Sequence, residues 1–580
     1  MNRLAIHIPA FLSVLLPTVS AVAVLGCSAD GELLGSLQGT ANAALHGPLR
    51  GWQDLARRRE GATARVFERA RASTGALSAF LRAMPKGADL HTHLSGAAST
   101  ENLIRWGQKD GMCVRTSDAT VVVPPCLPDT VPLSAAFPGS PLYQSLVSSW
   151  SLTDRTAPVR ERHQRFFDAF GKFSVVANSH VTDMVDEVVR RAAAQGVVHI
   201  EIIVGFQGSA IGRVADQQMD KAAEWNEGYL AQARDAILQS PEFRPAIQRS
   251  LEEISKIGSD LRTRWHCESS RPEPACEVSV RYLIHGVRTQ SREHVFGQWV
   301  YAFELAQADP RVVGVNLVAP EENSLSLSHY DDEMRALGLL SRWNRAQPGR
   351  QPVHIALHAG ELVPEVLPPG EAGQTHLRSH IRRAVGLAGA ERVGHAVDVM
   401  SEEEADGSEG GVEGAPGTPG ELPAPSLLRQ MAQSGVAVEV CLTSNQAILG
   451  TESEAHPLSA YLAAGVPVTL ATDDEGILRT DLSAEYLRAA QVQRLDYRQL
   501  KAIARNGLEK SFLPGPSFWE NPRSFTPVAV CSDADPARNA PPSPACQAFL
   551  ASSQRAQQQW RFERKLAAFE ATQTSLLAVP

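Results

Sequence analysis

Eight short runs of mainly apolar, β-branched residues recur along the middle of this 580-residue chain, mostly with helix-like segments between them. Continuous runs of this kind, alternating with helices, are typical of parallel strands that are buried on both faces. Eight of them predict an α/β fold, a (β/α)8 TIM barrel with insertions. An open doubly wound sheet is the alternative, but no glycine-rich phosphate loop follows the first run. The runs are residues 88–94, 197–204, 278–288, 311–319, 352–361, 392–397, 436–445 and 467–474.

Segments outside these runs define the predicted domains. Apolar residues at helical spacing up to residue 85 predict a helix that leads into the barrel. A Pro- and Ser-rich insertion at about 108–160 follows the first strand, and the acidic Gly/Pro/Glu tract 401–426 is too poor in apolar groups to pack, which predicts a disordered surface loop. We therefore expect a signal peptide (1–27), a tether with an N-terminal helical extension (28–83), the barrel (84–515), and a C-terminal extension with a cysteine pair and a helix (516–580).

The first 27 residues have the layout of an export signal, in which Arg3 precedes an apolar run that ends in Val-Leu-Gly-Cys27. This ending is similar to a bacterial lipobox, where the cysteine becomes lipidated. A plain membrane anchor is the alternative, because the run is long enough to span a bilayer, although prolines and a histidine interrupt it. We expect a protein that is exported and lipid-anchored to the bacterial cell envelope through Cys27, or secreted.

Six of the other cysteines form three pairs that are close in sequence and lie in Pro- or Ser-rich loops, as expected of disulfides in an oxidising compartment. No C-x-x-C occurs, which argues against a thiolate zinc site. Cys441 lies inside an apolar run and is predicted to be a buried free thiol. The predicted pairs are Cys113 with Cys126, Cys267 with Cys276, and Cys531 with Cys546.

The formal net charge of −9 argues against nucleic acid as the main partner, because that role usually requires a basic patch. A small molecule is the expected partner. We expect membrane attachment only through the N-terminal lipid. The N-terminal helices are a candidate contact for a homodimer.

Histidines and carboxylates occur where the predicted strands end, which is the edge of this type of barrel that carries chemistry. A lone His-x-His pair is weak evidence, but seven such residues at four strand ends support one another. Three histidines and one carboxylate suit zinc, with iron and cobalt as alternatives. The fourth run has no lysine that could bridge two metals, so we expect a single ion. The residues are His91, His93, His358, Glu361, His395, Asp473 and Asp474.

Six motifs carry a resemblance to a known family: MPKGADLHTHLSG, LHAGE, RVGHA, EVCLTSN, HPLSAYLAAGVPVTLATDDEG and a later segment that ends in EKSFLPG. In this order and spacing they resemble the adenosine deaminase family, over roughly residues 80–515. The leading helix, the insertion and the cysteine pairs are more similar to the secreted, growth-factor-related branch and its bacterial relatives. The resemblance implies a hydrolytic deaminase of purine nucleosides.

The resemblance also implies a role for each residue at the strand ends. Glu361 would donate a proton to purine N1, His395 would orient the zinc water and help to deprotonate it, and Asp474 would bond N7. These roles agree with the chemistry, because displacing ammonia from the ring requires hydroxide at C6 and a proton on N1. The implied ligands of one zinc ion per chain are His91, His93, His358 and Asp473.

Three positions depart from the family pattern. Ser95 stands where compact members have an aspartate for the ribose 5′-hydroxyl, and Ala319 stands where the family often has a glycine whose backbone contacts N3. Glu475 replaces the usual proline after the paired aspartates. The reaction is therefore better defined than the substrate. We expect a zinc-dependent deaminase of adenosine or 2′-deoxyadenosine. The alternatives are a deaminase of another 6-aminopurine, and an exported nucleoside-binding or signalling protein without activity.

Overall fold

The computed structural model describes residues 33–407, 426–452 and 455–576. The chain divides into two compact units, Met1–Gln53 and Asp54–Pro580. In the first unit the described residues belong to helix α1 (Leu33–Ala70). The predicted signal peptide, with Cys27, and most of the predicted acidic loop, 408–425, lie outside the described residues. None of the described helices combines the length and the hydropathy that a membrane span needs.

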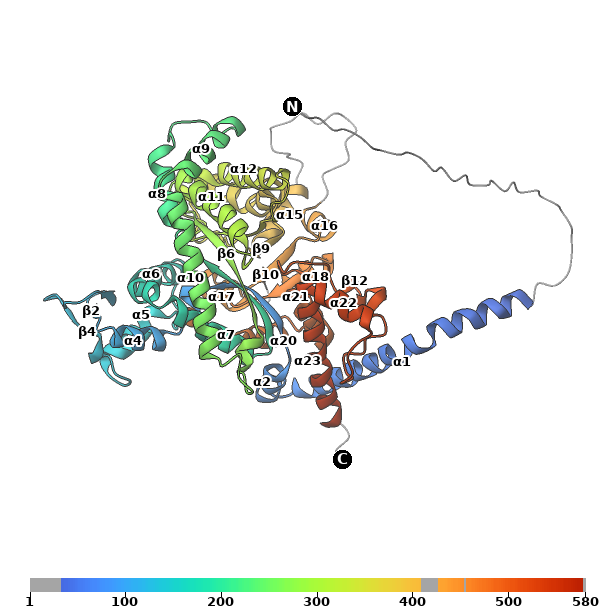
Figure 1. Ribbon diagram of the computed structural model, residues 1–580. Helices are drawn as coiled ribbons and strands as arrows, with labels where there is room; N and C mark the ends of the chain where they lie inside the picture. Colours follow the sequence, from blue (N-terminus) through green and yellow to red (C-terminus); the bar gives the residue numbers. More distant parts are fainter. Residues whose placement is uncertain (1–32, 408–425, 453–454, 577–580) are drawn as a thin grey trace, which may run out of the picture. The chain divides into compact units, whose positions relative to one another are not determined.

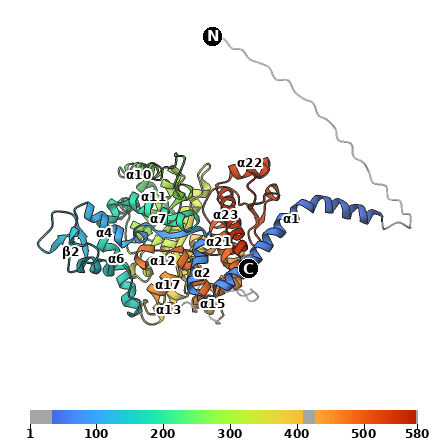
Figure 2. The same cartoon turned by 90° about the horizontal axis from the view of Figure 1, so that it is seen from below.

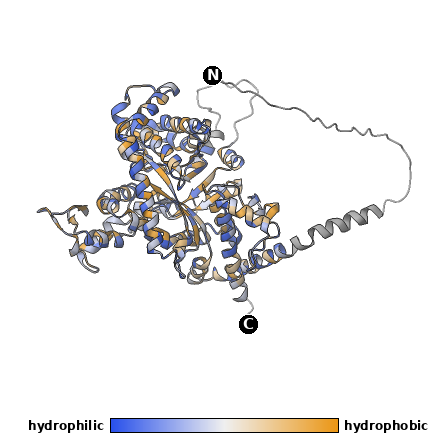
Figure 3. Cartoon of the chain, viewed as in Figure 1, coloured by the Kyte–Doolittle hydropathy of each residue, from blue (hydrophilic) through white to orange (hydrophobic). Residues whose placement is uncertain are grey.

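Eight parallel strands form one sheet, in the order in which they occur along the chain. The ring closes through a parallel bridge between Thr92 and Asp473, where His93 N donates to Asp473 O (3.0 Å) and Asp473 N donates to His91 O (2.9 Å). This confirms the predicted (β/α)8 barrel, whose central strands Figure 3 shows mainly in hydrophobic colours. The strands are β1 (Gly87–His93), β5 (Val197–Val204), β6 (Ser279–Val287), β7 (Val312–Val318), β8 (His354–Ala359), β9 (Arg392–His395), β10 (Ala437–Val440) and β11 (Val468–Leu470).

Helices follow each strand and surround the barrel (Figure 1). Those before and after β5 are α2 (Thr74–Ala83), α3 (Leu94–Ala97), α4 (Thr100–Lys109), α5 (Pro141–Trp150), α6 (Val159–Ser179), α7 (Val181–Ala194), α8 (Gly208–Gln218), α9 (Glu227–Gln239) and α10 (Phe243–Arg264). Those between β6 and β10 are α11 (Arg292–Ala308), α12 (Ser324–Ala346), α13 (Glu371–Leu377), α14 (His380–Arg383), α15 (Val399–Gly407) and α16 (Leu427–Ser434). Those after β10 are α17 (Leu442–Leu449), α18 (Leu458–Ala464), α19 (Glu475–Leu478), α20 (Leu482–Gln491), α21 (Tyr497–Glu509), α22 (Pro544–Ser552) and α23 (Gln554–Leu576).

The insertion after β1 has structure of its own. Strands β2 (Cys113–Arg115), β3 (Thr120–Val122) and β4 (Thr130–Pro132) form an antiparallel sheet, followed by α5. Leu152 N donates to Ile477 O (2.8 Å), which ties the insertion to α19, directly after the paired aspartates. Figures 1 and 2 both place β2 and α4 on one side of the barrel and α22 and α23 on the other. The C-terminal extension adds a small hairpin of β12 (Trp519–Asn521) and β13 (Thr526–Pro527).

The structure pairs the six cysteines as the sequence predicts, in three disulfides. Cys441 is buried and unpaired, as expected, but it lies one residue beyond β10 instead of inside a strand.

Three local predictions need correction. The helix expected before residue 85 is two helices, because the Ser73 side chain accepts from Ala76 N and starts α2. The terminal helix is likewise divided, since Ser553 Oγ accepts from Ala556 N (3.1 Å) between α22 and α23. Residues 401–407, expected in the disordered loop, continue helix α15, where the buried Glu402 accepts from Ile381 N (2.7 Å).

Candidate active site

The residues singled out at the strand ends converge at one end of the barrel. His91 and His93 lie on β1 with their rings on the same face, because side chains two apart on a strand point the same way. The remaining members lie at or just after the carboxyl ends of β8, β9 and β11: His358, Glu361, His395, Asp473 and Asp474. All seven are buried or nearly so.

Four of these side chains direct one atom each towards a common point. The Nε2 atom of His358 lies 3.0 Å from Nε2 of His91 and 3.0 Å from Nε2 of His93. Asp473 Oδ1 lies 3.5 Å from His91 Nε2 and 3.2 Å from His93 Nε2. These are the four ligands that the resemblance implies. Within 4.8 Å of one another lie the ligand atoms of two overlapping groups: His91, His358, His395 and Asp473 form the first, and His93, Asp473 and Asp474 form the second.

The geometry and charge of this cluster fit a metal ion. Four atoms that each lie about 2.1 Å from one ion are roughly 3–3.5 Å from one another, and the four distances given above lie in this range. Burial opposes a charge on Asp473, but contacts with His91 and His93 hold the pKa of its carboxyl well below the usual range, so it is an anion. Burial also opposes a charge on His91, yet Asp473 and Glu439 raise its pKa to about 10. A position that holds a proton so firmly also attracts a metal cation.

Neighbouring polar groups fix the direction of each ligand atom. His91 Nδ1 donates to Glu439 Oε2 (2.7 Å), and His358 Nδ1 donates to Asn316 Oδ1 (2.7 Å). Each ring therefore carries its hydrogen on Nδ1 and keeps the Nε2 lone pair for a metal. Ser444 Oγ donates to Asp473 Oδ2 (2.6 Å), which leaves Asp473 Oδ1 for the ion.

A buried row of charges supports Glu439. Arg392 donates through Nε to Glu439 Oε1 (2.5 Å) and through Nη2 to Glu201 Oε2 (2.7 Å). Burial opposes ionisation of Glu439, but Arg392 and His91 lower the pKa of its carboxyl. Phe512, from the segment after α21, lies under the Arg392 guanidinium, with its ring centroid 3.7 Å away. The protein thus keeps a carboxylate behind His91 at a depth where an unpaired charge would be costly.

Glu361 is held beside the cluster with its backbone fixed. Its backbone N and that of Gly360 each donate to Glu321 (3.0 Å each). Glu361 Oε1 lies 3.7 Å from His395 Nε2. Burial, with the nearby charge of Asp473, raises the pKa of the Glu361 carboxyl well above its usual range. This shift favours the protonated form of Glu361, the form that a general acid must supply.

Asp474 is a second carboxyl group whose surroundings favour the protonated form. Burial and the charge of Asp473 raise its pKa well above the usual range. Its Oδ1 atom is buried and has no hydrogen-bond partner among the described residues. A protonated carboxyl with a free buried oxygen is suited to hydrogen bonding with a ligand.

Gly96 makes room for Asp474. A Cβ atom added at Gly96 would lie 1.6 Å from Asp474 Oδ1 and 2.5 Å from its Cγ. We expect Gly96→Ala to displace Asp474 and to reduce kcat/KM by roughly 10–100-fold, the loss of one strong hydrogen bond of about 1.5–3 kcal/mol. Steady-state kinetics of ammonia release measure this. Gly171→Ala is the matched control, because its added methyl group meets nothing within 4 Å; equal losses in both variants would contradict the role of Gly96.

The structure also shows where the three positions that depart from the family pattern lie. Ser95 lies in α3 and is half-buried. Ala319 has a φ of 82°, in the left-handed region that favours glycine, and its carbonyl accepts from Arg288 Nε (2.6 Å). Glu475, for which the sequence offered no role, is buried and accepts from Arg191 Nε (2.8 Å), an ion pair that connects α19 with α7.

Sequence reasoning missed the residues that orient the ligands. Asn316, Glu439, Ser444 and Asn445 were not assigned roles, although three of them lie within the motif EVCLTSN. The sequence did contain a clue to the role of Glu439. A carboxylate inside an otherwise apolar strand that is buried on both faces requires a partner.

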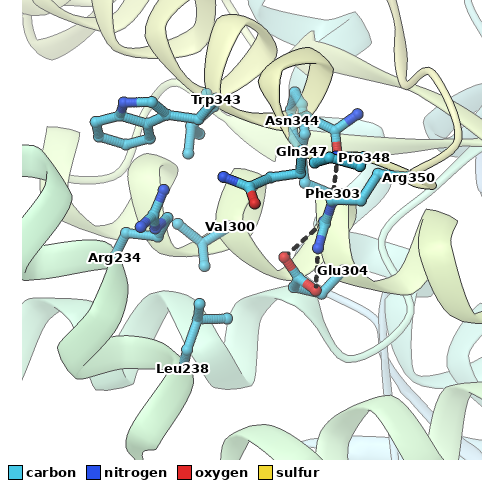
Figure 4. Close-up of a pocket in the computed structure, with 11 residues that line it drawn as sticks. Arg234, Leu238, Val300, Phe303, Glu304, Trp343, Asn344, Gln347, Pro348 and Arg350 are labelled. Atoms are coloured by element: carbon cyan, nitrogen blue, oxygen red, sulfur yellow. Dashed lines mark hydrogen bonds and ion pairs between the residues drawn. The ribbon is translucent and has the colours of Figure 1, made fainter.

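A separate cavity of about 370 Å³ lies between α9, α11 and α12 (Figure 4). Arg234 lies over the Trp343 ring at 4.5 Å, and Arg350 forms an ion pair with Glu304 (2.7 Å). None of the residues that line this cavity belongs to the cluster at the barrel mouth.

Comparison with known proteins shows which family and which relatives this chain is similar to. A family model described as adenosine deaminase matches residues 270–518. Adenosine deaminase of Escherichia coli O139:H28 is 31% identical over 200 residues, 34% of this chain and 49% of that protein. Residues 270–518 of this chain are thus similar to the adenosine deaminase family. Aminodeoxyfutalosine deaminase of Streptomyces coelicolor is 43% identical over 93 residues, 16% of this chain and 24% of that protein. The matched part thus spans less than half the length of these relatives.

Two solved structures to which the chain shows similarity are adenine deaminase from Arthrobacter aurescens and Arabidopsis ADAL complexed with IMP. The first is 18% identical with a TM-score of 0.43, covering 74% of this chain and 94% of the other. The second is 18% identical with a TM-score of 0.42, covering 74% and 93%.

Proposed function

We propose that this protein is a zinc-dependent hydrolase that converts adenosine or 2′-deoxyadenosine to inosine or 2′-deoxyinosine and ammonia. The observation that carries the proposal is the four-atom cluster of His91, His93, His358 and Asp473, with Glu361, whose pKa is raised by burial, beside it. A protein that only binds a nucleoside needs no protonated acid next to a metal site, so this arrangement favours the enzyme over the silent binding protein.

The residues at the mouth of the barrel, where the carboxyl ends of the strands lie, have separate roles in the reaction. His91, His93, His358 and Asp473 would hold the zinc ion, which would supply hydroxide chemistry at neutral pH for the attack on C6 of the purine. Glu361 gives its proton to N1, which makes C6 electrophilic and neutralises the charge that would build up on the ring. Asp474 donates a hydrogen bond to N7 and fixes the position of the base. Because all these groups are buried, each interaction is stronger than it would be in water.

Substrates other than adenosine are the second candidate. Ser95 is shorter than the aspartate of compact family members and carries no charge, so it holds a ribose 5′-hydroxyl less firmly. The Streptomyces relative is named for deaminating aminodeoxyfutalosine. We therefore propose first that a 6-amino group is lost from a purine, and second that this purine is adenosine or 2′-deoxyadenosine.

One assay separates these alternatives. The zinc-loaded protein is incubated with adenosine, 2′-deoxyadenosine, adenine and AMP, and ammonia release is followed for each. We expect adenosine and 2′-deoxyadenosine to react. Reaction of adenine or AMP alone would change the substrate, and no ammonia from any of the four would favour a silent binding protein.

We also propose that the protein acts outside the cytoplasm, anchored by a lipid on Cys27 or secreted. The three disulfides support an oxidising compartment. A homodimer through the N-terminal helices is a further proposal, which analytical ultracentrifugation would test.

Cys27→Ala should abolish lipid attachment while leaving activity unchanged, because the mouth of the barrel is built from residues after Gly87. Labelling cells with a radioactive fatty acid measures the attachment. Equal incorporation in the variant and the parent would show that Cys27 is not the site.

A further inference from the structure

A short chain of hydrogen bonds leads from a backbone N–H in helix α18 to His395. Leu458 N donates to His456 Nδ1 (3.1 Å). His456 Nε2 lies 3.1 Å from Asn445 Oδ1, and Asn445 Nδ2 lies 2.9 Å from His395 Nδ1. All four residues are buried. The chain therefore connects a fixed donor of the backbone with a histidine of the mouth.

The position of each hydrogen follows from the donor at the start. A backbone N–H can only donate, so His456 Nδ1 is an acceptor and the ring hydrogen of His456 lies on Nε2. This N–H donates to Asn445 Oδ1, which turns the amide NH2 of Asn445 towards His395. His395 Nδ1 must then accept, and a neutral imidazole that accepts at Nδ1 carries its hydrogen on Nε2.

The Nε2 atom of His395 faces the reacting groups. It is buried and makes no hydrogen bond to any of the described residues, and it lies 3.7 Å from Glu361 Oε1. His395 also belongs to a group with His91, His358 and Asp473 whose nearest ligand atoms all lie within 4.8 Å of one another. The N–H therefore points to the place where hydroxide and the purine would meet.

Helix α18 holds the backbone of this histidine as well. His395 and Ala396 have φ angles of 65° and 47°, a conformation that costs free energy unless the surroundings enforce it. Tyr461 OH donates to Ala396 O (2.6 Å) and so restrains the strained segment. The same short helix thus fixes both the backbone of His395 and, through Leu458, its hydrogen.

We propose that Asn445 and His456 are positioning residues that hold His395 in its Nε2–H form, so that His395 donates a hydrogen bond to the attacking oxygen. This rests on the proposed deaminase function and refines it. It differs from the role expected from the resemblance, in which His395 helps to deprotonate the water. Glu361 is then the proton carrier: the proton that its carboxyl group holds in the resting site is the one that water has lost, and the carboxyl gives that proton to N1.

Nitrogen NMR of the parent protein tests the tautomer without any assay of activity. The zinc-loaded protein is labelled with ¹⁵N-histidine, and the His395 signals are identified by their absence from a His395→Gln sample. We expect the Nε2 signal in the protonated range and the Nδ1 signal in the unprotonated range. The reverse pattern would overturn the proposal. This measurement requires no altered network, so it decides the question even if the Asn445 variant folds poorly.

Asn445→Asp tests the positioning role, because a carboxylate of the same shape can only accept. Asp at this position would draw the hydrogen of His395 to Nδ1 and leave Nε2 without one. We expect the ¹⁵N pattern of His395 to reverse and kcat to fall about 10²-fold, while KM changes by less than about twofold and zinc content stays the same.

Asn226→Asp is the matched control, because it adds the same charge at an exposed helix N-cap, where aspartate caps equally well. It should leave both readouts unchanged. If Asn445→Asp reverses the ¹⁵N pattern but keeps the parental kcat, the positioning role is wrong. If the parent releases no ammonia from any aminopurine, the proposed function fails, but the ¹⁵N pattern still decides the tautomer.

Discussion

Glu361→Gln should leave the zinc content near one ion per chain while kcat falls by about 10²–10⁴-fold. Glutamine keeps the size and most of the hydrogen bonding of Glu361 but has no proton to give to N1. Burial and the charge of Asp473 raise the pKa of the Glu361 carboxyl well above its usual range, which favours the protonated form in the parent. The loss should therefore appear mainly in kcat, with a small change in KM.

Glu365→Gln is the matched control, because Glu365 is exposed and lies four residues further along the same segment. It should behave like the parent. If Glu361→Gln deaminates adenosine at the parental rate at saturation, Glu361 is not the acid. If the Glu361→Gln variant loses its zinc, its rate gives no information about proton transfer. Glu361 would then be a residue that helps to bind the metal, contrary to its assignment here.

His358→Ala should remove most of the bound zinc and, with it, the activity. His358 Nε2 is the atom that contacts Nε2 of both His91 and His93, so its loss leaves only three protein ligands. Changing a residue that merely orients a ligand typically costs about 10–100-fold in metal affinity, and we expect a larger loss here. Elemental analysis after dialysis against a mild chelator, together with a zinc-binding isotherm, measures it.

His266→Ala controls for the loss of an imidazole, because His266 is exposed and is not part of the cluster. Parental zinc affinity in His358→Ala would remove His358 from the ligand set. A His358→Ala protein that keeps turnover without zinc would contradict the role of the metal altogether.

The barrel could be predicted because its strands are continuous apolar runs, which only parallel strands buried on both faces require. The ends of the runs were less predictable. Residues 436–445 read as one strand, but β10 stops at Val440 and α17 begins at Leu442. The apolar run continues across the turn, so its pattern does not mark where the backbone changes from strand to helix.

The ligands could be predicted because they occur at strand ends that the fold brings together. The residues that orient them could not, since their contacts join distant positions: His91 and Glu439 are 348 residues apart, and His358 and Asn316 are 42 apart. Such pairings depend on the register of the closed barrel, which the pattern of one sequence does not contain. Burial shows that a partner is needed, but not which residue supplies it.

The most direct test of the central claim is a zinc titration of the metal-free protein with ammonia release from the reactive nucleoside as the readout. Elemental analysis first confirms that dialysed, chelated protein contains no metal. If the four-ligand cluster binds the catalytic ion, activity starts near zero, rises in proportion to added zinc and levels off at one ion per chain. Full turnover by the metal-free protein, with no change as zinc is added, would contradict this account.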